Sequence, residues 1–170
     1  MSGRAAFVFV NGLFAIGLAA AIALLSGTPF IFPSLGPTAF MLFFAPEERA
    51  ASPRSTLGAH AVGILCGWAA LALFGLGHDP AALVSGVDLA RVGCAALALA
   101  STGALMILLD VVHPPAGPTT LIVALGIIER PEYLLVIEAA VALLIIQALV
   151  VNRLAGVPYP IWDAPRGERR

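Results

Sequence analysis

The sequence predicts an all-α polytopic membrane protein, and two observations carry that prediction. Hydrophobic residues make up 60% of the 170 residues and charged residues only 11%, against roughly 45–50% and about 25% in an average soluble domain. The charges are gathered into short segments, with long apolar stretches between them. Because a helix needs about 20 apolar residues to cross a bilayer core, we expect residues 1–170 to form a single membrane domain with four to six crossings.

Four segments have the length and apolar character of uninterrupted membrane spans. They are residues 5–25, 57–76, 89–109 and 133–151. Each lies between charged or polar segments, so we expect each to form a full transmembrane helix.

Two further apolar segments, residues 26–45 and 110–128, contain several prolines. Proline lacks a backbone N–H and clashes with the preceding helical turn, so neither segment can be one continuous helix. We expect each to consist of an extended stretch followed by a half-helix. The extended stretches are expected at residues 29–35 and 111–116, and the half-helices at residues 37–45 and 118–128.

The two broken segments also resemble each other. A shift of 81 residues places Gly36 on Gly117, Pro37 on Pro118 and Thr38 on Thr119, and it aligns the flanking prolines as well. Windows this rich in proline and glycine can match by chance, but the order of apolar and charged segments around them matches too. We therefore expect a duplicated unit, at about residues 5–76 and 89–151.

The distribution of arginine favours broken segments that cross the membrane over broken segments that enter and return. With six crossings, seven arginines lie on the side of the amino terminus and two on the other side, whereas with four crossings the division is six against three. The seven are Arg4, Arg49, Arg54, Arg153, Arg166, Arg169 and Arg170. Units of three crossings have opposite orientations when they follow one another, which predicts the inverted repeat common among secondary transporters.

The repeated Gly-Pro-Thr string is typical of a helix start, because proline is favoured there. The first turn of a helix leaves backbone donors free, here expected at residues 38–40 and 119–121. Each start also carries about half a positive charge from the helix dipole. Two such starts facing each other predict a binding site for a small anion. The alternative is that both strings are kinks whose backbone groups are satisfied by neighbouring side chains.

The candidate substrate-binding residues are the two strings and the polar side chains beside them. They are Ser34, Gly36, Pro37, Thr38, Ala39, His113, Gly117, Pro118, Thr119 and Thr120.

Four ionisable residues are candidates for proton coupling, because ionisable groups inside a membrane are functional by default. They are Asp110, His113, Glu138 and His60. A protonated His113 would attract an anion, whereas a neutral His113 would bond a carbonyl freed by the following prolines. Asp110 pairs with His113 or lies at the interface, and Glu138 and His60 fit a proton relay or helix packing equally well.

Other function classes find little support. The net charge of −1 gives no indication of nucleic acid binding. There is no phosphate-binding loop, serine elbow or metal-ligand spacing, so we expect no enzyme, no metal and no cofactor. Cys66 and Cys94 lie within apolar spans and are interpreted as small core residues.

Residues 110–119, DVVHPPAGPT, resemble the signature of the HPP family of small integral membrane proteins, and residues 32–39, FPSLGPTA, resemble its first motif region. The resemblance covers roughly residues 7–151. It implies a bacterial inner-membrane or chloroplast-envelope protein, and some members of that family are linked to nitrite transport. The family is usually described as having four transmembrane helices, which agrees with six crossings if the broken segments are counted as loops.

These observations together predict a membrane transporter or channel for a small inorganic anion, with nitrite or nitrate first. We expect it in the bacterial inner membrane, with both termini cytoplasmic. A homo-oligomer is expected because so short a chain has limited room to enclose a pathway. The main alternative is an accessory membrane subunit that transports nothing and turns its motif toward a partner protein, and a membrane enzyme is a third.

Overall fold

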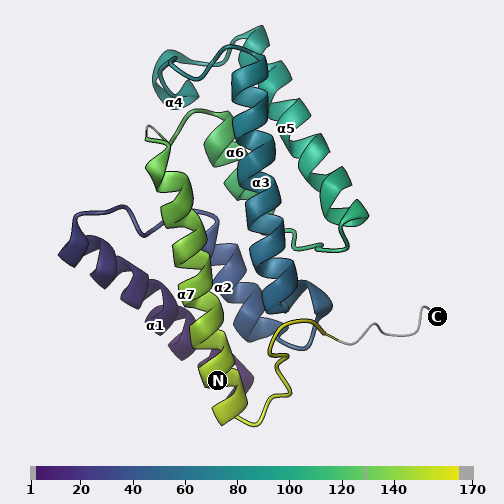
Figure 1. The fold of residues 1–170 in the computed structure, drawn as a ribbon. Coiled ribbons are helices and arrows are strands. Elements are labelled where there is room, and N and C mark those ends of the chain that lie inside the picture. Colours follow the sequence, from purple (N-terminus) through teal and green to yellow (C-terminus); the bar gives the residue numbers. More distant parts are fainter. Residues whose placement is uncertain (1–2, 129, 165–170) are drawn as a thin grey trace.

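A computed structural model describes residues 3–128 and 130–164, and all regular structure in these two ranges is helical (Figure 1). Four helices are long: α1 (Gly3–Ser26), α3 (Pro53–Leu73), α5 (Leu89–Leu108) and α7 (Glu132–Leu154). The remaining helices are short: α2 (Leu35–Phe44), η1 (Arg49–Ala51), α4 (Ala82–Ser85) and α6 (Ala116–Ala124). Since η1 is a 3₁₀ turn, the described chain contains seven α-helices and no strand.

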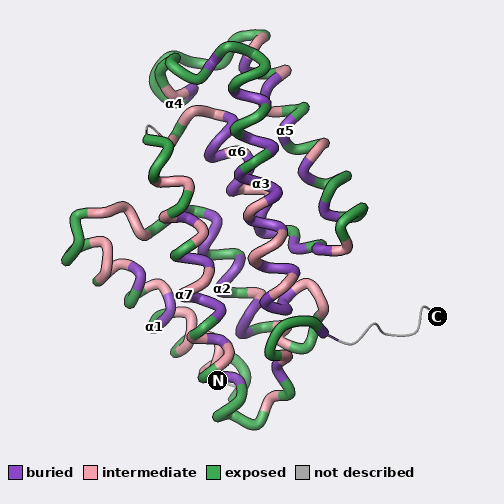
Figure 2. The backbone as a smooth tube through the Cα atoms, viewed as in Figure 1, coloured by how far each residue is buried: buried purple, intermediate pink, exposed green. Residues whose placement is uncertain are grey.

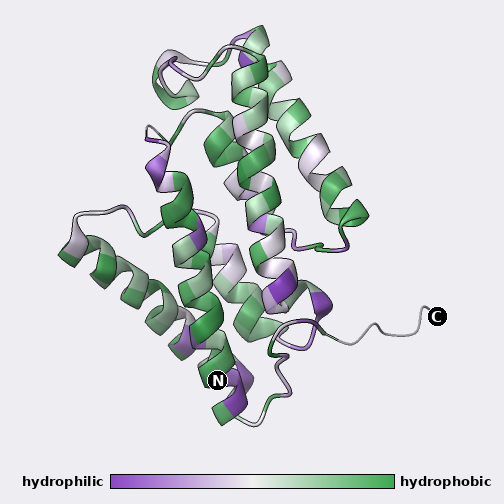
Figure 3. Ribbon diagram, viewed as in Figure 1, coloured by the Kyte–Doolittle hydropathy of each residue, from purple (hydrophilic) through white to green (hydrophobic). Residues whose placement is uncertain are grey.

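The four long helices are long and apolar enough to cross a membrane, which confirms the predicted spans (Figure 3). Their ends differ from the prediction most clearly in α3. This helix begins at Pro53 and not at residue 57, because Ser52 caps it by accepting a hydrogen bond from the Ser55 N–H at 3.3 Å. It ends at Leu73 and not at residue 76, because Gly75 adopts φ +69° and turns the chain.

The two short helices α2 and α6 begin at Leu35 and Ala116, two residues before the predicted starts. Helix α6 also ends at Ala124 and not at residue 128, where Gly126 with φ +70° turns the chain. The first four residues of any helix have N–H groups without a partner inside the helix, so proline is tolerated throughout this turn. The Gly-Pro pair in the sequence therefore predicts the first turn of each helix but does not determine at which residue the helix starts.

The second broken segment runs along α3 from one end of that helix to the other. Arg54, near the start of α3, donates to the carbonyls of Leu109 and Asp110 at 3.1 and 2.7 Å, so the second segment begins at this end. The segment's helix, α6, ends beside Leu125. The carbonyl of Leu125 accepts a hydrogen bond from the N–H of Ala82, in the connection that follows α3. Since α3 runs between these contacts, the second segment traverses the bundle, and Figure 1 shows α2 and α6 running in opposite directions.

Basic residues collect at the end of the bundle where α3 begins, which we call the basic end. Arg4 donates to Phe44 O at the close of α2, and Arg49 and Arg54 follow in the connection to α3. Arg153 joins them through Tyr159, whose hydroxyl donates to Ala51 O at 2.7 Å. The other three arginines of the predicted set, Arg166, Arg169 and Arg170, lie outside the described residues.

Helix α3 is the centre of the packing and contacts α5, α6 and α7. Figure 2 shows buried residues concentrated along α3, α2 and α6, whereas α1 and α5 are largely exposed. Two glycines, Gly63 and Gly67, lie one turn apart on the side of α3 that meets α6. A Cβ atom at Gly67 would lie 2.9 Å from Thr120 O and 2.8 Å from Val123 Cβ. The two backbones therefore approach as closely as small residues permit.

We expect Arg91→Leu to lower the free energy of unfolding by about 3 kcal/mol, because a charged hydrogen bond contributes roughly 1.5–3 kcal/mol. Arg91 is only 3% exposed and donates to Ala124 O at 3.3 Å and Pro80 O at 3.1 Å, so it caps the end of α6. Denaturant unfolding in detergent, followed by circular dichroism, measures the change. Arg130→Leu is the control, since the Arg130 side chain is 65% exposed; an equal loss in both variants would contradict the capping role.

Candidate functional site

The two half-helices begin in the same way. Ser34 before α2 has φ −70° and ψ −21°, and Pro115 before α6 has φ −59° and ψ −14°. The N–H groups of Leu35 and Ala116 each donate to the carbonyl three residues earlier, at 2.9 and 3.0 Å. Both copies of the motif thus enter their helices through the same tight turn.

One of the backbone donors that the sequence led us to expect is already engaged. Because α2 starts two residues early, the N–H of Thr38 lies within the helix and donates to Ser34 O at 3.3 Å. In the second copy, the N–H of Gly117 donates to Pro114 O at 2.9 Å. The prediction of a free amide is therefore wrong at Thr38, and the ligand chemistry proposed below rests on side chains.

Side chains from both motif copies meet at a pair of buried histidines. Thr38 Oγ1 lies 3.0 Å from His60 Nε2 and 3.4 Å from His113 Nε2. Thr119 Oγ1 lies 2.8 Å from the other ring nitrogen of His60, Nδ1. The two rings are 5.3 Å apart between centroids, and all four residues are 0% exposed. We call these four residues the His–Thr cluster, and in it α3 places His60 between the equivalent threonines of the two copies.

The acceptors around the cluster decide where its hydrogens lie. The Ala50 carbonyl can only accept, so His113 Nδ1, at 2.6 Å, carries a hydrogen. The Thr38 hydroxyl donates to Ser34 O (2.9 Å) or to His113 Nε2, and in either case its oxygen accepts from His60 Nε2–H. With His60 neutral, its Nδ1 then accepts the hydroxyl hydrogen of Thr119. These assignments follow from matching donors with acceptors.

Further hydroxyl groups lie on or beside the helices that carry the cluster. Thr120 Oγ1 lies 3.0 Å from Thr102 Oγ1 and also donates to Ala116 O at 3.2 Å. The hydroxyls of Ser34 and Thr56 are buried and have no hydrogen-bond partner. Buried hydroxyls without a partner are costly, so these two are available to a polar ligand that reaches the cluster.

The Gly-Pro pairs of the motif lie on the outward side of the half-helices, away from the buried threonines. Gly36 and Pro37 are exposed, and Gly117 and Pro118 are partly exposed. The two exposed residues and Pro118 line an apolar groove of about 740 Å³ between the motif copies. Ala39 packs in the apolar core. The predicted site residues thus divide into a buried polar set and an outward apolar set.

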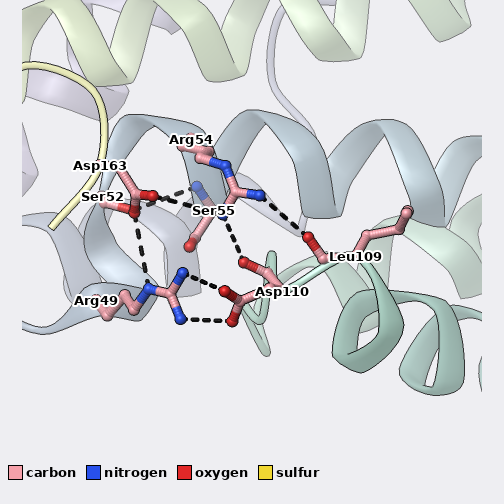
Figure 4. A network of polar contacts seen from close by, with 7 residues as sticks. All are labelled: Arg49, Ser52, Arg54, Ser55, Leu109, Asp110 and Asp163. Carbon is pink, nitrogen blue, oxygen red and sulfur yellow. Dashed lines mark hydrogen bonds and ion pairs between the residues drawn. The ribbon is translucent and has the colours of Figure 1, made fainter. Parts of the chain in front are cut away.

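Asp110 belongs to a polar network at the basic end (Figure 4). Its carboxylate accepts two hydrogen bonds from Arg49, and its carbonyl accepts one from Arg54. Asp163 lies 3.7 Å from Arg49 Nε and 3.6 Å from Arg54 Nη1. The hydrogen bonds to Asp110 raise the pKa of the Arg49 guanidinium above its ordinary value. The network ties the segment after α5 to η1, to α3 and to the segment that follows α7. Within it, arginine side chains supply the hydrogen bonds to Asp110.

Glu138 takes no part in the hydrogen bonds of the His–Thr cluster. It lies on α7, and one of its carboxylate oxygens is buried without a hydrogen-bond partner. Among the four candidates for proton coupling, the structure therefore brings together His60 and His113, while Asp110 is engaged by arginines. Within the described ranges, no group of three His, Cys, Asp or Glu side chains is placed to hold a metal ion.

Sequence reasoning gave His60 too little weight and omitted Thr56, Thr102 and Arg49 from the site region. Thr102 follows Ser101 within an apolar span, and Thr56 lies just before one; hydroxyl residues in such places commonly serve helix packing. One signal was available for Arg49 and Asp110, since a lone carboxylate that closes a long apolar span needs a cationic partner.

One of three comparisons with known proteins finds a match. The family model described as HPP, transmembrane region, matches residues 2–160. No curated protein matches the chain. No solved structure matches it either. Since the family model spans nearly the whole chain and includes both motif copies and the His–Thr cluster, the chain belongs to the HPP family of membrane proteins.

Proposed function

We propose that the chain is a membrane transporter or channel for a small inorganic monovalent anion, nitrite or nitrate first, and that the anion binds at the His–Thr cluster. The observation that carries the proposal is that equivalent threonines of the two motif copies, Thr38 and Thr119, contact one buried histidine, His60. Hydroxyl and imidazole N–H groups are donors suited to an oxyanion. The starts of α2 and α6 add positive potential beside them.

The proposal includes an inverted repeat, in which α1–α3 correspond to α5–α7. Packing supports it: α1 contacts α2 as α5 contacts α6, and α2 contacts α7 as α6 contacts α3. The outer helices follow the same rule, since α1 contacts α7 and α5 contacts α3. A two-fold axis through the α3–α7 contact exchanges each of these pairs.

Helix ends support the same repeat. The shift of 81 residues that aligns the motifs places the last residue of α3, Leu73, on the last residue of α7, Leu154. It also places Gly75, with φ +69°, on Gly156, with φ +77°.

Arginine caps follow the same correspondence. An arginine in the first turn of α1, Arg4, donates to the last carbonyl of α2, and Arg91 in the first turn of α5 does the same for α6. Equivalent caps at opposite ends of the bundle are what opposed units require.

The chemistry of the cluster fits an ion that must be released. Its donors are neutral hydroxyl and imidazole groups, and transport requires binding that is favourable but weak enough for release. Because the four side chains bond to one another, an arriving anion exchanges these bonds for bonds to itself. The Ser34 and Thr56 hydroxyls, which have no partner, supply further donors.

We further propose a setting and assembly for this transporter. The basic end faces the bacterial cytoplasm, because arginine and lysine accumulate on that side of inner-membrane proteins. Both termini are then cytoplasmic. The protein acts as a homo-oligomer with one site per protomer and performs no catalysis.

Purified protein in liposomes tests the proposal through uptake of nitrite and nitrate. We expect uptake above that of protein-free liposomes, and we expect the double variant Thr38→Val, Thr119→Val to lower it at least about tenfold, since valine keeps the shape and loses the hydroxyl. Thr28→Val, in the connection after α1, is the matched control. Absence of uptake by the unaltered protein, or full uptake by the double variant, contradicts the proposal.

A further inference from the structure

The His–Thr cluster forms an unbroken series of hydrogen-bonding atoms. It begins at Ala50 O, which lies 2.6 Å from His113 Nδ1, and continues from His113 Nε2 to Thr38 Oγ1 at 3.4 Å. From there it passes to His60 Nε2 at 3.0 Å and from His60 Nδ1 to Thr119 Oγ1 at 2.8 Å. All four ring nitrogens therefore face an oxygen, and every N–H that a proton creates there finds an acceptor.

Among the residues that the structure describes, the arginines near this place are engaged by other partners. Arg49 and Arg54 at the basic end are engaged by Asp110 and Asp163. Arg91 is held by the carbonyl of Ala124 at the end of α6 and by that of Pro80. Helix α7 contributes a carboxylate, Glu138, which does not attract an anion.

A monovalent anion in a buried site costs several kcal/mol unless a partner charge accompanies it. The only groups at the cluster that can supply one are the two imidazoles. We infer that the site takes up one proton with each anion, and that the His60–His113 pair holds this proton. The inference rests on the proposed function and specifies what accompanies its substrate.

The hydrogen count shows how proton and anion are linked. In the neutral cluster, the Thr119 hydroxyl hydrogen is committed to His60 Nδ1. A solvent proton that binds His60 Nδ1 makes this nitrogen a donor to Thr119 Oγ1, and the hydroxyl hydrogen of Thr119 turns away from the ring to meet the anion. The N–H bond forms as the proton's O–H bond to the hydronium that delivers it breaks, water leaves, and the added charge of +1 balances the anion.

The pair holds one proton and not two. The ring centroids are 5.3 Å apart and both side chains are fully buried, so a second positive charge would be repelled by the first at short range. One proton per monovalent anion makes the transported combination electrically neutral.

Nitrate uptake into liposomes tests this stoichiometry, because nitrate has no neutral acid near pH 7 that could cross lipid unaided. With the membrane potential held at zero and the outside one pH unit more acidic, we expect nitrate to accumulate about tenfold, since one pH unit and a tenfold concentration ratio are the same free energy. A pH-sensitive dye inside the liposomes should report acidification. Nitrate that enters but reaches only the outside concentration overturns the coupling and leaves the proposed function intact. No entry of any anion overturns the proposed function itself.

Two variants assign the proton to the histidines. His60→Gln still offers hydrogen bonds to both threonines but takes up no proton, so we expect the ratio of inside to outside nitrate to reach only about one at equilibrium, even where uptake is slower. Glu138→Gln is the control and should keep the tenfold accumulation. Accumulation retained by both His60→Gln and His113→Gln, or lost in Glu138→Gln, overturns the assignment.

Discussion

Replacing His60 with leucine is expected to lower anion flux at least about a hundredfold and the free energy of unfolding by about 3 kcal/mol. Leucine fills much of the space but leaves Thr38 and Thr119 without the ring nitrogens that now lie 3.0 and 2.8 Å away. Each buried hydroxyl that loses its partner costs about 1–3 kcal/mol. The flux falls as well, because the anion loses the His60 imidazole, which contacts threonines from both half-helices.

The control for this change is His78→Leu. His78 is exposed in the connection between α3 and α4, so the same chemical change there should leave both quantities nearly unaltered. Flux in liposomes and denaturant unfolding in detergent measure the two effects. A His60→Leu protein that transports anions at the original rate would show that the cluster is structural. His60→Gln should recover most of the lost stability, because its amide reaches both hydroxyls.

The second large effect is expected for Gly67→Ala, which should lower the free energy of unfolding by about 2 kcal/mol and flux by about tenfold. A new Cβ would meet Thr120 O at 2.9 Å and Val123 Cβ at 2.8 Å, and backbone cannot yield as a flexible side chain does. Overpacking of this kind costs roughly 1–3 kcal/mol. Helix α6 must move away from α3, and Thr119, which α6 carries, moves away from His60.

Gly103→Ala is the matched control for this packing effect. Gly103 lies within α5, and a Cβ there meets nothing within 4 Å. Alanine favours a helix over glycine by about 1 kcal/mol, so this variant should gain stability where Gly67→Ala loses it. The same sign of change in both variants would show that close contact between α3 and α6 is not required.

Much of the fold was predictable because a membrane imposes length and polarity on every span. The four long helices follow from composition alone, and proline in residues 26–45 and 110–128 indicated the two breaks. The positions of helix ends were less predictable. Proline is tolerated anywhere in the first turn of a helix. Pro37 therefore fits a helix that starts at residue 35 or at residue 37, and Pro118 fits one that starts at residue 116 or at residue 118.

The site was predictable in part, for a similar reason. The duplicated strings identified Thr38 and Thr119, but they also predicted free amides, and the early start of α2 engages the amide of Thr38. His60 stands at no repeated position, since the shift of 81 residues aligns it with Val141. Its role appears only in the folded chain, where α3 places it between Thr38, which is 22 positions away in the sequence, and Thr119, which is 59 positions away. Patterns along a sequence do not encode that convergence.

The central claim is that an anion binds at the histidines between the two motif copies, and nitrogen-15 solid-state NMR of the imidazoles in bilayers tests it most directly. The chain has three histidines, and the exposed His78 serves as an internal reference. Saturating nitrate is expected to shift both ring nitrogens of His60, with a third N–H appearing on the His60–His113 pair, while His78 stays unchanged. Ring signals of His60 and His113 that do not respond at nitrate concentrations where flux saturates would contradict the claim.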